Sequence, residues 1–136
     1  MNWPLKWILL FSYLILAACA TQTGLREELD RSVKAYNRML RWHELENAGT
    51  TYVETELQDE YLKKVSSLKK RGLSFTDFRI NSIRYIPETK TGDVITEFEY
   101  YILPSNRVKT LSYHQEWIYL ESLKSWKVKS GLPVFE

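Results

Sequence analysis

The chain has 136 residues, which is enough for one domain and too few for two ordinary ones. Aromatic residues make up 14% of it and charged residues 26%, a composition that suits a packed core and excludes a disordered chain. The formal net charge of +2 indicates no polyanionic partner such as nucleic acid, and a single cysteine excludes a disulfide framework and a cysteine-ligated metal site.

The N-terminus has the layout of a secretory signal sequence. Lys6 precedes an uncharged apolar stretch, residues 7–18, which is shorter than the ~20 residues that cross a bilayer as a helix. The stretch ends in small residues immediately before Cys19. We therefore predict that residues 1–18 are a signal peptide, with an uncleaved anchor or a conventional secretory signal as the alternatives.

The residues at the end of this stretch, Leu16-Ala17-Ala18-Cys19, resemble the lipobox of bacterial lipoproteins, Leu-Ala-(Gly/Ala)-Cys, at all four positions. The resemblance implies that the Cys19 sulfur carries diacylglycerol, that cleavage occurs just before it, and that the new amino terminus takes a fatty acid such as palmitate. Several acyl chains on one residue hold a protein firmly to a membrane. No aspartate follows Cys19, as in lipoproteins sent to the outer membrane, where the domain faces the periplasm. Residues 19–24 would form a lipidated tether.

Two amphipathic helices are predicted next. Apolar side chains at steps of three and four mark one face of a helix over residues 25–46, namely Leu25, Leu29, Val33, Tyr36 and Leu40. Asn47-Ala48-Gly49 predicts its end. Thr51 and Glu54 have the spacing of a capping box, so a second helix is expected to start at Thr51 and to stop at Gly72.

Alternating patterns beyond Gly72 predict strands. Phe78 and Ile80 differ in parity from Ile83 and Tyr85, so the first strand requires a β-bulge near Asn81-Ser82. A turn is expected at 91–93. Two further strands place these residues on one face each: Val94, Thr96, Phe98, Tyr100 and Ile102 in the first, and Leu111, Tyr113, Gln115, Trp117 and Tyr119 in the second. Turns at 104–106 and 122–125 separate them from each other and from a last strand beginning at Trp126.

The expected fold class is α+β: two N-terminal helices packed on a curved antiparallel sheet of about four strands, in a single domain over residues 25–136. The order of elements, with QEWIYLES and SWKVKSGLPVF at the end, resembles the cone-shaped superfamily named after nuclear transport factor two. A cystatin-like arrangement is the alternative. Residues 47–51 leave no room for the hairpin that many members of the superfamily have between their early helices.

The resemblance implies a pocket at the wide end of the cone. The residues expected to line the core or this pocket are Tyr36, Tyr61, Phe98, Tyr100, Tyr113, Gln115 and Trp117. We expect a non-enzymatic binding or assembly module for an envelope protein or a small apolar ligand, with no cofactor. The alternative is a small-pocket enzyme similar to polyketide cyclases and ketosteroid isomerases.

Individual polar residues give little indication of catalysis. His114 can act as an acid or base near neutral pH, but its parity is opposite to that of the aromatic residues of its strand. Gln115 is expected to be a satisfied core amide bonded to Tyr100 or Tyr113, or else a ligand-fixing group in the pocket. Glu97 and Glu99 share the face expected to be solvated. We therefore assign no catalytic residue.

The two histidines and the basic cluster of the second predicted helix have ordinary structural interpretations. His43 is interpreted as a helix-edge residue, and two distant histidines give no basis for a metal site. The basic residues near the end of the second helix suit its dipole, with contact to anionic lipid headgroups as the alternative. They are Lys63, Lys64, Lys69, Lys70 and Arg71.

Overall fold

The computed structural model describes the backbone of residues 3–136 and the side chains of residues 7–8 and 24–136. The side chain of Cys19 therefore lies outside the described residues, and the lipidation predicted for it stays a prediction. Within the described part of the chain, no helix is both long enough and apolar enough to cross a membrane.

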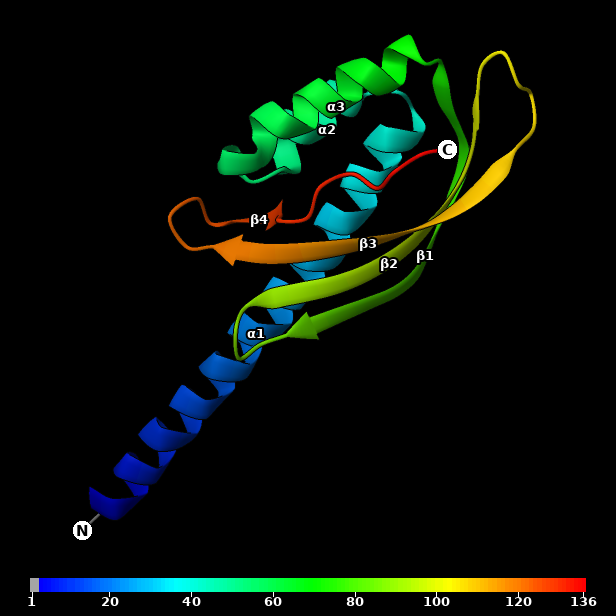
Figure 1. The fold of residues 1–136 in the computed structure, drawn as a ribbon. Helices are drawn as coiled ribbons and strands as arrows, with labels where there is room; N and C mark the ends of the chain where they lie inside the picture. The colour runs from blue at the N-terminus through cyan, green and yellow to red at the C-terminus, as the bar shows by residue number, and fades with distance from the viewer. Residues whose placement is uncertain (1–2) are drawn as a thin grey trace.

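Helices come first in the chain and strands follow. The elements are α1 (Trp3–Arg41), α2 (Leu45–Tyr52), the 3-10 helix η1 (Thr55–Leu57), α3 (Gln58–Lys70), β1 (Leu73–Ile86), β2 (Thr91–Ile102), β3 (Lys109–Leu120) and β4 (Ser125–Val128). The strands form one antiparallel sheet in the order β1-β2-β3-β4. Figure 1 shows α1 crossing one face of the curved sheet, with α2 and α3 beside its far end. The predicted α+β class with a four-stranded antiparallel sheet is confirmed.

The predicted apolar stripe of α1 is buried, with Leu29, Val33, Tyr36 and Leu40 in the core. The helix stops at Arg41, so the predicted end at residue 46 is wrong. His43, which has a φ of 65°, turns the chain, and the Glu44 amide donates to the Met39 carbonyl oxygen at 2.9 Å. This left-handed cap is usually built on glycine. Sequence patterning missed it because a histidine occupies the position.

The predicted break at residues 47–49 and the helix start at Thr51 are also wrong, because these residues lie inside α2. Gly49 is not a breaker here. A Cβ atom at this position would overlap the ring of Tyr61 on α3, so glycine permits the close approach of the two helices. Glu54 precedes η1 without a side-chain cap, and the predicted capping box does not form. Gly72, with a φ of 80°, does end the α3 segment as predicted.

The sheet confirms one irregularity predicted from the sequence and corrects a turn. β1 shifts register between Ile80 and Ser82, at the predicted bulge, and also between Phe75 and Asp77. The turn expected at 91–93 lies instead at residues 87–90. Gly92 belongs to β2, where a Cβ would come within 2.6 Å of Leu29 Cδ2, so this glycine again marks a close approach.

The predicted inward faces of β2 and β3 are confirmed. Val94, Thr96, Phe98 and Tyr100 are buried on β2, and Tyr113, Gln115 and Trp117 are buried on β3. Beyond β4, residues 129–136, which we call the C-terminal segment, run back across the domain toward the end of α1 (Figure 1).

Candidate functional site

All seven residues predicted to line the core or a pocket are buried, none more than 3% exposed. Tyr36 comes from α1, Tyr61 from α3, Phe98 and Tyr100 from β2, and Tyr113, Gln115 and Trp117 from β3. The structure therefore brings together residues that lie up to 81 positions apart in the sequence. Their polar atoms decide whether this region is a site or a core.

The tyrosine hydroxyls have partners within the domain. The hydroxyls of Tyr36 and Tyr113 lie 3.2 Å apart, and the Tyr61 hydroxyl donates to the Leu45 carbonyl oxygen at 2.9 Å. Burial raises the pKa of Tyr113 to about 12 and, as the main cause, also raises the pKa values of Tyr36 and Tyr61. All three are therefore neutral hydroxyl groups near pH 7.

The amide of Gln115 is satisfied by Asn37, a residue of α1. Gln115 Nε2 donates to Asn37 Oδ1 at 2.6 Å, and Asn37 Nδ2 donates to Gln115 Oε1 at 3.3 Å and to the Val33 carbonyl at 2.8 Å. The Trp117 indole donates to the same Gln115 oxygen at 3.1 Å. The interpretation as a satisfied core amide is confirmed, but the predicted partners, Tyr100 and Tyr113, are wrong.

Phe98 and Tyr100 belong to an aromatic cluster that the C-terminal segment completes. Phe98 lies 4.8 Å from Phe75 between ring centroids, and Phe135 lies 5.1 Å from Tyr100 and 5.5 Å from Phe75. Such edge contacts add to the free energy gained by burial. The Tyr100 hydroxyl donates to the main-chain oxygen of Glu136 at 3.2 Å.

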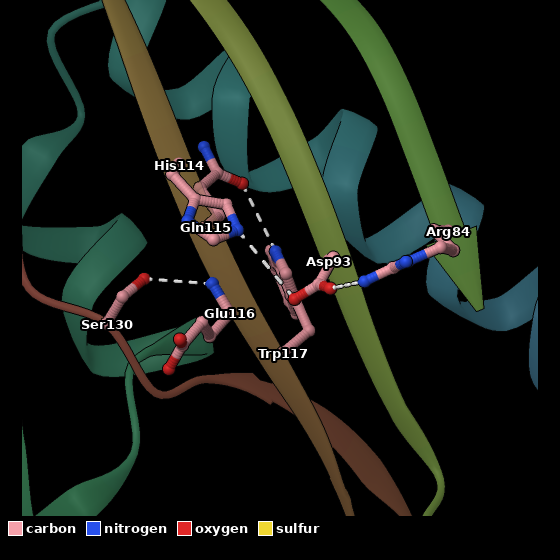
Figure 2. Close-up of polar contacts among 7 residues, drawn as sticks. All are labelled: Arg84, Asp93, His114, Gln115, Glu116, Trp117 and Ser130. Atoms are coloured by element: carbon pink, nitrogen blue, oxygen red, sulfur yellow. Dashed lines mark hydrogen bonds and ion pairs between the residues drawn. The ribbon is translucent and has the colours of Figure 1, made fainter. Parts of the chain in front are cut away.

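His114 lies on the outer face of the sheet, which settles an orientation that its parity left open, since Val108, Ile118 and Leu120 share that parity. Its side chain is 58% exposed, and its Nε2 is 3.7 Å from Asp93 Oδ1. Figure 2 shows Asp93 between His114 and Arg84, and it also shows the hydrogen bond between Gln115 and Trp117. Gln115 and Trp117 are buried, so they lie on the inner face of the sheet. The hydrogen bond from Arg84 is the main cause that lowers the pKa of Asp93. This exposed group is an ion-pair cluster, and it does not enclose a reacting atom.

The other polar residues of the sheet have similar surroundings. Glu97 pairs with Arg79 at 2.6 Å on the solvated face, and Glu99 is exposed, as predicted. Within the described residues, no three metal-ligating side chains come close enough together to hold an ion.

Three of the five basic residues near the end of α3 bind the domain itself, while Lys63 and Lys70 are exposed. Lys64 donates to the Leu132 carbonyl oxygen at 2.5 Å, and Arg71 donates to that of Phe135 at 3.0 Å. Lys69 forms an ion pair with Glu46 at 2.5 Å. These side chains fasten the C-terminal segment and α2, which supports a structural role over contact with lipid headgroups.

One hollow lies between β3 and the C-terminal segment, with a volume of about 680 Å³. We call it the distal groove. Its lining residues are Tyr100, Arg107, Val108, Lys109, Thr110, Leu111, Val134 and Glu136. Val134 is 69% exposed and Val108 is 51% exposed. The groove therefore presents apolar side chains beside two cations, a combination that suits binding of a partner.

Tyr100 is the one predicted pocket residue that also lines the distal groove. Tyr61 lines a smaller hollow of about 140 Å³ with Leu57 and Leu132. Sequence patterning missed Asn37, Arg107 and Val134 as site residues. Asn37 alone carried a signal, because it is a polar residue next to the buried stripe position Tyr36.

Comparison with known proteins gives the fold and nothing more specific. No protein-family model and no curated protein sequence matches the chain. Among solved structures, the fold is similar to the intermembrane space region of the chloroplast protein ARC6, with a TM-score of 0.53. The two are 11% identical, and the match covers 80% of this chain and 96% of that one.

Proposed function

We propose that this protein is a bacterial lipoprotein whose domain is a non-enzymatic binding or assembly module for an envelope protein. Acyl chains on Cys19 would anchor it in the outer membrane, facing the periplasm. The observation that carries the proposal is the position of the distal groove. The N-terminal part of α1 projects beyond the sheet, whereas the β2–β3 loop and the C-terminus lie at the opposite end of the domain (Figure 1).

This arrangement suits a module that binds on its far side from the membrane. A domain held at the start of α1 presents the groove to the compartment, where a partner protein can reach it. The groove combines exposed apolar side chains with Arg107 and Lys109, which is the mixture found at protein interfaces. A small apolar ligand is the other occupant that such a lining suits.

The core supports a binding module over an enzyme. A small-pocket enzyme of the cyclase or isomerase kind needs a polar group directed at its substrate. Here the amide of Gln115 is occupied by Asn37 and Trp117, and the hydroxyls of Tyr36 and Tyr113 face each other. These groups serve the core.

For the fold, we propose membership of the cone-shaped superfamily named after nuclear transport factor two. Three helices on a curved four-stranded sheet support it, because many members of that superfamily have a third helix. A cystatin-like arrangement has a long helix across a sheet as well, and α1 fits that description (Figure 1).

Two measurements test the proposed function. Mass spectrometry of the N-terminal peptide from membranes should find a triacylated Cys19; an unmodified cysteine or a retained Met1 segment would contradict the anchor. A photo-crosslinking amino acid at Val134 should capture an envelope protein in membranes. Leu123 is the matched control, because it is 55% exposed in the turn at the other end of β3. Equal capture from both positions, or none from Val134, would contradict the module.

A further inference from the structure

The N-terminal part of β3 pairs with β2 on one side and, among residues 24–136, with no strand on the other. β4 pairs with β3 only along residues 117–120 of β3. At Glu116 the main chain still has partners, because its carbonyl accepts from the Lys129 amide at 2.7 Å and its amide donates to Ser130 Oγ at 3.0 Å (Figure 2). Toward its N-terminus, β3 has no pairing on this side.

The direction of the main-chain groups follows from the strand repeat. Since Glu116 presents its amide and carbonyl away from β2, residues two and four positions away do the same. These are Thr110, Ser112 and His114, whose side chains are exposed. Among residues 24–136, none forms a hydrogen bond to these six main-chain groups. We call residues 110–114 of β3 the open edge.

The other borders of the sheet are interrupted or covered in part. β1 is interrupted by two bulges, Arg41 donates to the Phe75 carbonyl oxygen at 3.1 Å, and the Phe78 amide donates to Asp77 Oδ1 at 2.8 Å. The border of β4 is covered at Val128, whose carbonyl accepts from the Glu54 amide at 3.0 Å. Proteins commonly protect strand edges with bulges, charges and covering loops. Unlike these borders, the open edge is regular and uncovered.

The open edge forms one wall of the distal groove, because Thr110 and Leu111 line it. We infer that the partner of this module docks by strand addition: an extended peptide segment with a carboxylate near Arg107 pairs with residues 110–114 and places alternate apolar side chains in the distal groove. Main-chain pairing supplies affinity in this mode, and the groove supplies selectivity. Five residues of strand span about 17 Å.

Charge decides the chemistry of the peptide. Arg107 lies just before β3, and Lys109, which begins β3, already donates to the main-chain oxygen of Glu136 at 2.7 Å. Among residues 24–136, Arg107 is therefore the cation of the distal groove that has no ion-pair partner. Glu136 also lines the groove, and exposed Glu99 lies opposite Thr110 on β2. A peptide with one carboxylate opposite Arg107 is therefore favoured over a peptide with a basic residue at that position. The inference rests on the proposed function only in taking the partner to be a protein.

The experiment uses the full chain in lipid nanodiscs and a phage library of random twelve-residue peptides as the probe. Peptides that bind should be enriched in acidic residues and in alternating apolar residues. Ser112→Pro removes one outward amide without removing a hydrogen bond to β2, since that amide faces away from it. We expect Ser112→Pro to weaken the selected peptides by at least about tenfold. Ser112→Ala, which keeps the amide, should bind as the wild type does.

A second measurement does not depend on how a proline variant folds. In the wild-type chain, amide hydrogen exchange at Thr110, Ser112 and His114 should slow on adding a selected peptide, while exchange at exposed Glu99 should not change. Peptides unaffected by Ser112→Pro, no enrichment at all, or no added protection would overturn strand addition. A concentration-dependent dimer that Ser112→Pro abolishes would overturn the peptide as occupant, because it would assign the edge to a second copy.

The two proposals fail separately. If Val134 captures an envelope protein in membranes and Ser112→Pro leaves that capture unchanged, the binding module stands and strand addition does not. If selected peptides protect the open edge but no protein is captured from membranes, strand addition stands and the proposed partner does not.

Discussion

The two faces of β3 carry polar groups with different surroundings. On the inner face, Gln115 and Tyr113 are buried and bonded to partners on α1. On the outer face, His114 and its neighbour Asp93 belong to an exposed cluster with Arg84. A buried polar group that loses its partner retains the cost of desolvation, whereas water replaces the partner of an exposed one. The buried polar residues of the inner face, which we call the inner row, therefore stabilise the fold. The exposed cluster of the outer face, which we call the outer row, contributes little to stability.

The largest loss of stability is expected at alkaline pH, where the buried tyrosine hydroxyl groups ionise. The raised pKa values of Tyr36, Tyr61 and Tyr113 mean that the unfolded chain releases protons which the folded chain retains. The stability that these neutral hydroxyl groups contribute is fully present below pH 10, and the free energy of unfolding falls as the pH rises toward 12. Tyr113 alone accounts for about 2 to 3 kcal/mol. Urea unfolding at several pH values between 9 and 12 measures this loss. The free energy of unfolding should fall less steeply with pH in Tyr113→Phe than in the wild type. An equally steep fall in the variant would exclude Tyr113 as a cause.

Removing one partner of the amide pair should have the next largest effect. Asn37→Ala leaves the buried Gln115 amide without its partner and should lower the free energy of unfolding by about 2 kcal/mol. In the double variant Asn37→Leu with Gln115→Leu, the loss should be smaller than the sum of the two single losses, because the Trp117 indole N–H is then the group of this network that lacks its acceptor. Urea denaturation gives both values. A double variant as unstable as the sum of its single changes would show that the pair is not coupled.

The close packing of α2 on α3 allows a test that compares a buried position with an exposed one and changes no polar group. Gly49→Ala places a Cβ in the ring of Tyr61, whose hydroxyl is held by Leu45. We expect a net loss of about 1 to 2 kcal/mol, since overpacking outweighs the helix propensity gained. Gly131→Ala is the control, because a Cβ there meets nothing within 4 Å. Equal melting temperatures for the two variants would count against the close packing at Gly49.

The outer row should give the smallest change. Arg84→Ala should alter the free energy of unfolding by less than about 0.5 kcal/mol, because the pair is exposed and screened. Its effect should appear instead in titration. Arg84 lowers the pKa of Asp93, so the small stability it adds is lost as the pH falls through that lowered value. In the variant, nuclear magnetic resonance should find a higher Asp93 pKa; an unchanged value would assign the shift to another group.

Periodicity predicted the parts of the fold that burial determines. The stripe of α1 and the alternation of β2 and β3 depend on which side chains are buried, and the spacing of apolar residues in the sequence indicates these side chains directly. The bulge in β1 followed from the same rule, because Ile80 and Ile83 needed to face the same side. These predictions required no knowledge of which elements are neighbours.

Glycine positions were misread for a physical reason. Gly49 and Gly92 were interpreted as breakers, although each allows a neighbouring side chain to approach the backbone. That neighbour, Tyr61 or Leu29, is distant in sequence, so local propensity cannot indicate it. The partner of Gln115 was missed in the same way, because the contact with Asn37 spans 78 positions. The open edge also depends on pairing, which is a property of the sheet and not of any one segment.

The helix α1 runs without interruption through residue 19 to Arg41. If the chain is cut before Cys19, as proposed, the lipidated end and the domain share one rigid rod of about 33 Å, at 1.5 Å per residue. The number of residues in this helix would set both the distance of the groove from the lipidated end and its direction around the helix axis. Deleting two residues ahead of Leu25 would lower the groove by about 3 Å but swing it by about 200° around the helix axis. If Cys19 is the anchor as proposed, the length of the first helix would therefore set the direction in which the groove faces along the membrane surface.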